Sequence, residues 1–296
     1  MFLLGFTLPS DAVEFNYLGY KSHETAMQCY DHGNVYPFKI FPPKGLAHLS
    51  FAPITILYGS NGSGKSTLLN IISEKLGLVR CAPFNRTPYF DSYLEYCTVG
   101  YPEHKYNVPH GSRMITSDDV FDYLLSVRSV NQGIDDRRSR LAEEYRQTKK
   151  EYTPRFTSLA DMDEYLRVYE VKHSTKSQYV SRRGISKELA GKSNGESAFS
   201  YFTDKIQENA LYLLDEPENS LAPLLQSELL QFISDSVRFY NCQFIIATHS
   251  PFLLSLPEAK IYDLDSLPVE TKKWTELAGV RAYFDFFIKH QKEFDV

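Results

Sequence analysis

Gly59-Ser60-Asn61-Gly62-Ser63-Gly64-Lys65-Ser66-Thr67 is the stretch that decides the fold, and it lies between two apolar runs, Ile54–Tyr58 and Leu68–Ile72. This order of strand, glycine-rich turn and helix is the setting that a phosphate-binding loop requires. Its glycines let backbone N–H groups surround a phosphate chain, and the helix N-terminus adds partial positive charge. A chance glycine-rich turn is the alternative, but the full pattern with both flanks favours nucleotide binding.

The residues of this loop predict how it would hold ATP and Mg²⁺. Lys65 would reach the β- and γ-phosphates, and the hydroxyl of Ser66 would ligate Mg²⁺. The residues expected to bind nucleotide here are Asn61, Gly62, Ser63, Gly64, Lys65, Ser66 and Thr67. Upstream, Tyr36 or Phe38 could lie against the adenine ring, although an aromatic residue in a Pro-flanked turn more often only packs.

The composition sets bounds on the class of protein. A chain of 296 residues can form one large α/β domain, or one domain with an inserted subdomain. A net charge of −5 argues against a protein coated in nucleic acid, while a local basic patch stays possible. The four cysteines form no metal-ligand spacing with histidine, so we expect a reduced, cytoplasmic protein. No stretch approaches the ~18 apolar residues of a membrane span, and we expect no direct membrane insertion.

Turn residues and apolar spacing predict most of the remaining elements. They are short strands and turns over 1–58 with a strand at the start, a helix over 68–78 that Gly77 ends, an irregular connection over 80–112, a helix that begins at Ser117, a short strand over 260–264 and a terminal helix around 282–290.

Residues 131–190 differ in composition from their surroundings and divide the chain into three parts. The flanking parts, 1–130 and 191–296, would form one ATPase body, with 131–190 as a charged helical hairpin or lid. Within it, residues 131–185 hold twelve Lys and Arg against nine Asp and Glu. The most basic portion, 172–187, is either a solvated face or a contact for nucleic acid or an acidic partner.

An acidic pair ends the apolar run Leu211–Leu214. In phosphate-loop ATPases the strand beside the loop ends in an acid that holds Mg²⁺, and Asp215 fits this role. Glu216 directly follows it and is placed to orient and deprotonate the attacking water. Adjacent carboxylates can also cap a helix, but the apolar strand before them and Pro217 after them favour catalysis.

A second apolar run, Phe244–Ala247, delivers Thr248-His249-Ser250 to its end. Ligands of parallel sheets bind at such ends, so we expect His249 to contact the γ-phosphate or the attacking water. A lone histidine after a strand is otherwise usually structural. Farther upstream, Ser193 and the backbone of Gly195 precede a predicted helix, where they would form an anion site or a plain cap.

In order, these stretches resemble four motifs of ABC-type ATPases: Walker A (Gly59–Thr67), the signature (Ser193–Glu196), Walker B (Leu213–Pro217) and the switch histidine (Thr248–Ser250). The chain looks most like the soluble, single-domain, AAA_21-like ATPases allied to chromosome-maintenance, recombination-repair and phage-defence ATPases. The resemblance implies an α/β P-loop NTPase fold with an ABC-type ATPase head, in which helices flank a mixed sheet and a small helical insert interrupts the chain.

The resemblance also implies a homodimer that sandwiches two ATP molecules. Each ATP would lie between Walker A of one copy and Ser193 with Gly195 of the other, so that binding is coupled to association. Two departures stand out in this sequence. Ala222 occupies the position where transporters usually place an aspartate, and no clear Q-loop glutamine precedes the insert. Asp118 is the substitute expected at the metal site.

The residues favour an ATP hydrolase, and the resemblance implies a switch that regulates a separately encoded effector protein or acts on DNA, in phage defence or genome maintenance. The nucleotide-binding subunit of an ABC transporter is one alternative, and Ala222 and the charged insert count against it. A scaffold that ATP clamps without appreciable hydrolysis is the other. Glu216 and His249 favour real turnover over that scaffold.

Overall fold

The computed structural model describes residues 1–21, 35–104, 106–150, 162–182 and 193–294. The chain divides into two compact units. Residues 1–121 together with 194–296 form what we call the head, and residues 122–193 form what we call the insert. Arg183 and Lys187 of the predicted basic portion lie outside the described residues.

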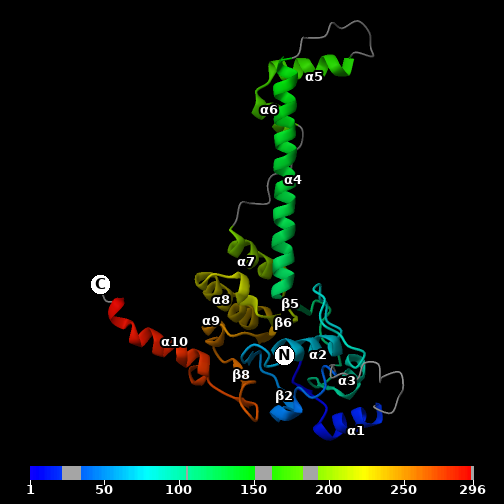
Figure 1. The fold of residues 1–296 in the computed structure, drawn as a ribbon, viewed down its shortest axis with the longest axis vertical. Helices are drawn as coiled ribbons and strands as arrows, with labels where there is room; N and C mark the ends of the chain where they lie inside the picture. The colour runs from blue at the N-terminus through cyan, green and yellow to red at the C-terminus, as the bar shows by residue number, and fades with distance from the viewer. Residues whose placement is uncertain (22–34, 105, 151–161, 183–192, 295–296) are drawn as a thin grey trace. The chain divides into compact units, whose positions relative to one another are not determined.

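A six-stranded mixed sheet forms the centre of the head, in the order β5-β6-β7-β3-β8-β9 (Figure 1). Its strands are β3 (Ile54–Tyr58), β5 (Arg113–Thr116), β6 (Leu211–Asp215), β7 (Gln243–Ala247), β8 (Lys260–Asp263) and β9 (Glu270–Thr271). All neighbours pair in parallel except β9, which is antiparallel to β8. The three central strands are covered on both faces, which explains their continuous apolar runs. The expected mixed sheet flanked by helices is confirmed.

The order of the central strands differs from the sequence-based expectation. The acid-bearing strand β6 was expected beside β3, and this is wrong because β7 lies between them. Ala247 of β7 pairs with Leu57 on one side and with Asp215 on the other. The ends of the three strands are therefore level, and the acid faces the phosphate loop across the end of β7.

A second, antiparallel sheet of three strands packs in the head core, in the order β2-β1-β4. Its members are β1 (Gly5–Thr7), β2 (His48–Ser50) and β4 (Thr98–Gly100). The buried side chain of Gln243 in β7 ties the N-terminal segment to the main sheet. Its Oε1 accepts hydrogen bonds from the backbone N–H of Phe2 (2.7 Å) and Leu3 (2.9 Å), and its Nε2 donates to the carbonyls of Leu3 (2.7 Å) and Ala52 (3.2 Å).

Helices of the head follow the predicted pattern in part. They are α1 (Asp11–Lys21), α2 (Lys65–Leu76), α3 (Phe90–Tyr96), the start of α4 (Ser117–Lys150), α7 (Asn194–Lys205), α8 (Pro223–Tyr240), α9 (Pro251–Leu254) and α10 (Ala278–Lys289). Gly77 ends α2 in the left-handed conformation, as predicted.

Two expectations for the N-terminal half are wrong. Residues 11–21 form a helix, because Asp11 and Glu14 are acids of a first helical turn and do not interrupt a strand. The connection over 80–112 contains α3 and β4, since Phe90 and Tyr93 lie one helical turn apart and are fully buried. Proline and asparagine around them hide this spacing in the sequence.

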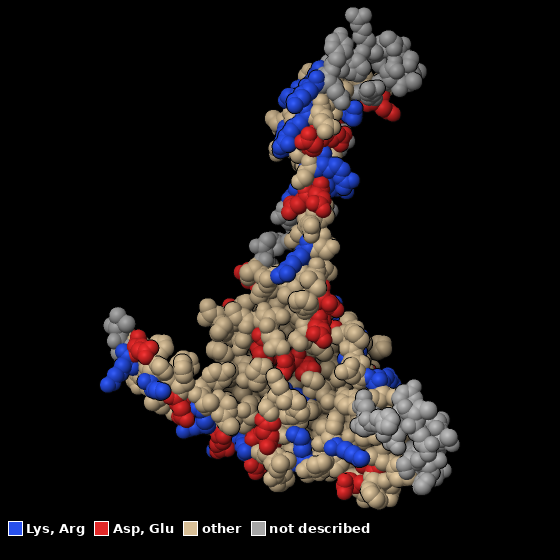
Figure 2. All heavy atoms as spheres, in the orientation of Figure 1, with Lys and Arg blue, Asp and Glu red and all other residues tan. Residues whose placement is uncertain are grey.

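The insert is helical, with α4 continuing unbroken through Gly133 and followed by α5 (Met162–His173) and α6 (Lys176–Arg182). Its small core joins Tyr145 of α4, Val171 of α5 and Tyr179 of α6. Lys and Arg side chains are interspersed with Asp and Glu along it (Figure 2). Although α4 has 34 residues, neither it nor any other helix in the described ranges is apolar enough to cross a membrane.

Replacing Gln243 with leucine tests the tie between the two sheets. Gln243→Leu keeps the volume but leaves buried backbone groups of Leu3 without their partner, so the free energy of unfolding should fall by about 2–4 kcal/mol. Urea denaturation measures this loss. Gln231→Leu, at an exposed position of α8, is the control and should change stability by less than about 0.5 kcal/mol. Equal stability of the two variants would contradict the assigned role.

Candidate active site

The loop between β3 and α2 has the geometry of a phosphate cradle. Gly62 and Gly64 have φ values of +82° and +99°, which favour glycine. The first N–H groups of α2 have no intrahelical acceptor and can bind an anion. The buried Oγ of Ser63 has no hydrogen-bond partner among the described residues. Asn61 lies at the exposed tip of the loop, and the whole cradle fits a phosphate chain.

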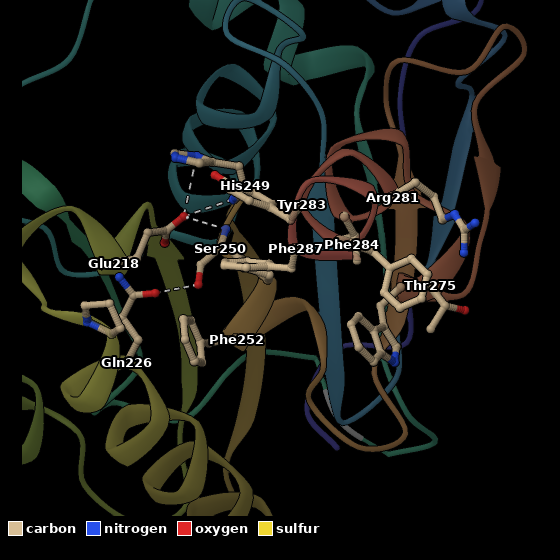
Figure 3. A pocket seen from close by; sticks show the side chains of 14 residues that line it. Glu218, Gln226, His249, Ser250, Phe252, Thr275, Arg281, Tyr283, Phe284 and Phe287 are labelled. Carbon is tan, nitrogen blue, oxygen red and sulfur yellow. Dashed lines mark hydrogen bonds and ion pairs between the residues drawn. The ribbon is translucent and has the colours of Figure 1, made fainter. Parts of the chain in front are cut away.

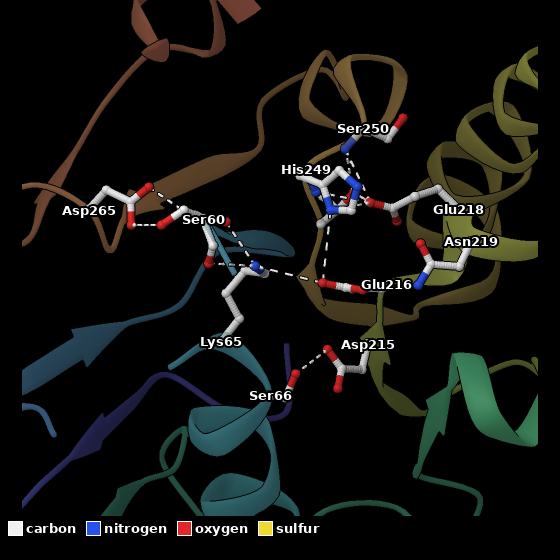
Figure 4. A network of polar contacts seen from close by, with 12 residues as sticks. Ser60, Lys65, Ser66, Asp215, Glu216, Glu218, Asn219, His249, Ser250 and Asp265 are labelled. Atoms are coloured by element: carbon white, nitrogen blue, oxygen red, sulfur yellow. Dashed lines mark hydrogen bonds and ion pairs between the residues drawn. The ribbon is translucent and has the colours of Figure 1, made fainter. Parts of the chain in front are cut away.

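Lys65 is 5% exposed and lies at the centre of the polar network in Figure 4. Its Nζ donates to the carbonyl oxygens of Gly59 (2.8 Å) and Ser60 (3.2 Å), and it lies 3.7 Å from Oε1 of Glu216. These carbonyls belong to the loop itself, so Lys65 folds back over the cradle. A phosphate in the cradle would compete for the same ammonium group.

Asp265 is a loop-holding residue that the sequence analysis missed. Its carboxylate accepts hydrogen bonds from the backbone N–H of Ser60 (2.7 Å) and from the Ser60 hydroxyl (2.9 Å). It follows β8, the neighbour of β3 on the side away from β7. An acid just after an apolar strand was the available signal, but only the strand order connects it with the phosphate loop.

The three metal-ligand candidates line one cavity. Ser66 Oγ donates to Asp215 Oδ1 at 3.0 Å, and both residues line a cavity of about 390 Å³ with the exposed Asp118. Burial raises the pKa of Asp215 to about 6, against the opposing effect of the Ser66 hydrogen bond. No cluster of three or more His, Cys, Asp or Glu side chains suited to a metal occurs in the described part of the chain. Two carboxylates and a hydroxyl are nevertheless oxygen ligands of the kind that Mg²⁺ takes beside phosphates.

Arg80 adds a positive charge to the same cavity. Its guanidinium donates to Asn70 Oδ1 (2.9 Å) and to the carbonyl of Ala82 (3.0 Å), and it lies over the ring of Phe84 at 4.2 Å. Burial lowers the pKa of Arg80 from its ordinary value. The side chain is therefore held in place beside the residues expected to meet the phosphates. Sequence analysis missed it because residues 80–112 looked irregular.

Glu216 adopts a backbone conformation that is rare for its residue type. Its φ and ψ are 49° and 53°, in the left-handed region. The turn directs its carboxylate toward Lys65 and toward His249, whose Nδ1 lies 3.9 Å from Oε1. Asn219 holds the other oxygen, since its Nδ2 donates to Oε2 at 2.9 Å. The structure thus brings Glu216, His249 and Lys65 together.

Glu218 organises the loop that carries His249, and the sequence analysis gave it no role. One buried oxygen, Oε1, accepts from Thr248 Oγ1 (2.6 Å) and from the backbone N–H of His249 (2.9 Å) and Ser250 (3.2 Å). The same oxygen lies 3.5 Å from His249 Nδ1. The other oxygen, Oε2, is buried without a hydrogen-bond partner among the described residues. Glu218 therefore fixes the position from which His249, about half exposed, reaches Glu216.

The two candidates for an adenine contact, Tyr36 and Phe38, lie in different surroundings. Phe38 is 2% exposed and stacks on Tyr17 with ring centroids 4.9 Å apart, so it belongs to the core and this part of the expectation is wrong. Tyr36 lines a cavity of about 470 Å³ with Thr67, Asn85 and other residues next to the phosphate loop. Its hydroxyl donates to Thr67 Oγ1 at 3.3 Å.

The signature residues lie at the start of α7, which begins at Asn194. Ser193 precedes the helix and is exposed. A Cβ at Gly195 would lie 2.6 Å from Leu225 Cδ1, so α7 packs closely against α8 there and a larger residue would have to displace the Leu225 side chain. Neither residue lines the cavities around Ser66 or Thr67.

Among known proteins, a family model described as "AAA domain, putative AbiEii toxin, Type IV TA system" matches residues 189–255. No curated protein matches the chain in sequence. Among solved structures, the chain is similar to an Smc head domain with an extended coiled coil from Pyrococcus furiosus, with TM-score 0.40, 14% identity and coverage of 82% of this chain and 95% of that one.

Two further solved structures show similarity at comparable levels. An SMC head domain from Thermotoga maritima has TM-score 0.38 and 13% identity, covering 89% of this chain and 94% of that one. An ATP-binding cassette in a post-hydrolysis dimer with ADP and Pi has TM-score 0.34 and 12% identity, covering 78% and 90%. The family match covers the two strands that bring Asp215 and His249 to the phosphate loop, and it supports an ABC-type P-loop ATPase-like domain.

Proposed function

We propose that the protein binds ATP with Mg²⁺, hydrolyses it to ADP and phosphate, and uses this cycle as a molecular switch. The observation that carries the proposal is the meeting of Lys65, Glu216 and His249, which come from separate elements. Lys65 Nζ and His249 Nδ1 lie 3.7 and 3.9 Å from the same oxygen of Glu216. A cation, a carboxylate base and a polar side chain near one point suit phosphoryl transfer to water, which depends on charge stabilisation and on positioning of the attacking water.

Binding would use the cradle and the cavity beside it. The N–H groups at the start of α2 and the Lys65 ammonium would hold the phosphates, and Tyr36 would lie near the base. Ser66, Asp215 and Asp118 would hold Mg²⁺, which would neutralise charge on the phosphate oxygens. The charge of Lys65 is needed most as negative charge shifts during phosphoryl transfer.

Glu216 would act as the base toward the attacking water. Asn219 occupies one of its oxygens and leaves Oε1 for the proton. The left-handed turn keeps this oxygen on the side of Lys65 and His249. His249 would then contact the water or the γ-phosphate from the position that Glu218 fixes. The site therefore relies on positioning and electrostatics, and forms no covalent intermediate with the protein.

The switch would operate between two copies of the chain. Ser193 and Gly195 line neither cavity at the phosphate loop, which suits a role toward the ATP of a second copy. The output would be a separately encoded effector protein or nucleic acid, in phage defence or genome maintenance. The described part of the basic portion, 172–182, offers Lys172, Lys176 and Arg182 for such a contact.

Glu216→Gln tests hydrolysis directly. The amide keeps the size of the side chain but cannot take a proton, so turnover should fall at least about 100-fold while ATP binding persists. An ATP-bound dimer should accumulate in size-exclusion chromatography with light scattering. Glu228→Gln, at an exposed position of α8, is the control. An unchanged phosphate-release rate would remove Glu216 as the base, and negligible release by the unaltered protein would favour the scaffold alternative.

Substitution of Glu218 should lower the turnover number and leave the affinity for nucleotide unchanged. Glu218→Ala removes the acceptor that holds the loop of His249, so kcat should fall at least about tenfold, whereas the ATP dissociation constant should stay the same. Glu218→Gln should recover most activity, because one oxygen accepts all three hydrogen bonds. Loss of ATP binding in both variants would indicate a merely structural role.

Asp215 should lower the stability of the nucleotide-free protein at neutral pH. Because its pKa rises from 3.8 to about 6 on folding, the folded state binds a proton more tightly, and stability rises as pH falls from about 6 to 4. Asp215→Asn should therefore be more stable by about 2 kcal/mol at pH 7.5, with the difference vanishing near pH 4. Urea denaturation without Mg²⁺ measures it, with the exposed Asp204→Asn as control. Equal stability of the variant and the unaltered protein at pH 7.5 would contradict this penalty.

A further inference from the structure

An apolar groove of about 880 Å³ lies in the head beside α10 (Figure 3). Its walls carry aromatic side chains from three elements, namely Phe252 of α9, Trp274, which precedes α10, and Tyr283, Phe284 and Phe287 of α10 itself. Its polar end contains Glu218, His249 and Ser250. The groove therefore connects an aromatic surface with the loop of the candidate catalytic histidine.

Helix α10 leaves most of its apolar surface uncovered. All twelve of its residues are described, and only Val280 is buried. The first turn is anchored where Gly279 N–H donates to the Tyr58 hydroxyl at 2.9 Å. Beyond this turn, the side chains that are 50–56% exposed are Tyr283, Phe284, Phe286, Phe287 and Ile288. Figure 2 shows charged side chains along one edge of this helix and uncharged surface along the other.

The uncovered area is large for a monomer. Aromatic side chains have about 150–250 Å² to bury, so the four aromatic side chains and Ile288 at about half exposure leave on the order of 500 Å² open. A typical monomer has a largest apolar patch of about 300–600 Å². In the groove, Trp274 and Phe252 are 39% and 37% exposed, and they add to the uncovered apolar area. Together these surfaces approach the ~800 Å² per partner that a standard protein interface buries.

The same face presents both halves of a contact, a protruding aromatic helix and an aromatic groove beside it. In a two-fold arrangement, α10 of each copy can enter the groove of the other, and both uncovered surfaces are buried at once. We propose that α10 and this groove form a homodimer contact that needs no nucleotide. The contact differs from the proposed ATP sandwich because its apolar residues are those of α10, α9 and Trp274 and it includes no residue of the phosphate loop, although its polar end contains Glu218 and His249.

This contact reaches the catalytic loop. A helix in the groove lies against the end that contains Glu218 and His249, so formation of the contact alters the rate of ATP hydrolysis. That consequence rests on the proposed function, whereas the contact itself does not. Association without nucleotide and the effect on turnover are therefore measured separately.

The test uses the full chain without ATP or Mg²⁺ in a concentration series. Sedimentation velocity should show a monomer–dimer equilibrium. Trp274 is the single tryptophan of the chain, so its emission should shift to shorter wavelength as the dimer forms. Phe287→Glu should raise the dimer dissociation constant at least about tenfold. Phe15→Glu, on α1 and 76% exposed, is the matched control and should leave it unchanged. Circular dichroism verifies folding of both variants.

The outcomes separate this contact from the ATPase proposal. Lys65→Ala should retain the nucleotide-free dimer even where ATP binding is lost. A chain that stays monomeric up to about 100 μM overturns the contact, as does a dimer that Phe287→Glu leaves intact or one that forms only with ATP. Binding of the monomer to phosphatidylcholine–phosphatidylglycerol vesicles in place of dimerisation would assign this face to lipid and also overturn it.

Discussion

A buried lysine charge is the constraint on which the site depends. Lys65 begins α2 with 5% of its surface exposed, and lysine is almost never buried without partners. Two carbonyl oxygens of its own loop and the Glu216 carboxylate meet this need. The left-handed glycines that allow the loop to turn, and the Asp265 carboxylate that holds Ser60, keep those carbonyls in place. Folding therefore assembles a positive centre that is already aimed at the cradle.

The acids around this centre have different tasks because their surroundings differ. Asp215 is partly buried with a hydroxyl partner and has a raised pKa, which costs stability without a cation. Glu216 lies in a strained turn, where Asn219 donates to one carboxylate oxygen and the other oxygen faces Lys65 and His249. Glu218 is buried and uses one oxygen to organise the next strand end. Three carboxylates within four residues thus share the positioning that catalysis requires.

Much of the head could be predicted from local patterns, because glycine spacing, apolar runs and caps act over a few residues. The phosphate loop, the strand ending at Asp215, the strand before Thr248 and the stop at Gly77 all have such signals. The helices over 11–21 and 90–96 were missed, since prolines and polar neighbours hide their short apolar spacing. The roles of Glu218 and Asp265 could not be predicted from local patterns, because each acts on a segment distant in sequence. Arg80 was missed because residues 80–112 looked irregular.

The sequence by itself determined that this chain folds a phosphate loop between a buried strand and a helix, and that acids and a histidine follow other buried strands. Local backbone preferences and hydrophobic periodicity suffice for that. Only the tertiary structure decided that β7 separates β6 from β3, that Glu218 holds the loop of His249, and that α10 leaves its aromatic face open. Strand order and burial depend on pairing between distant segments, which no local pattern encodes.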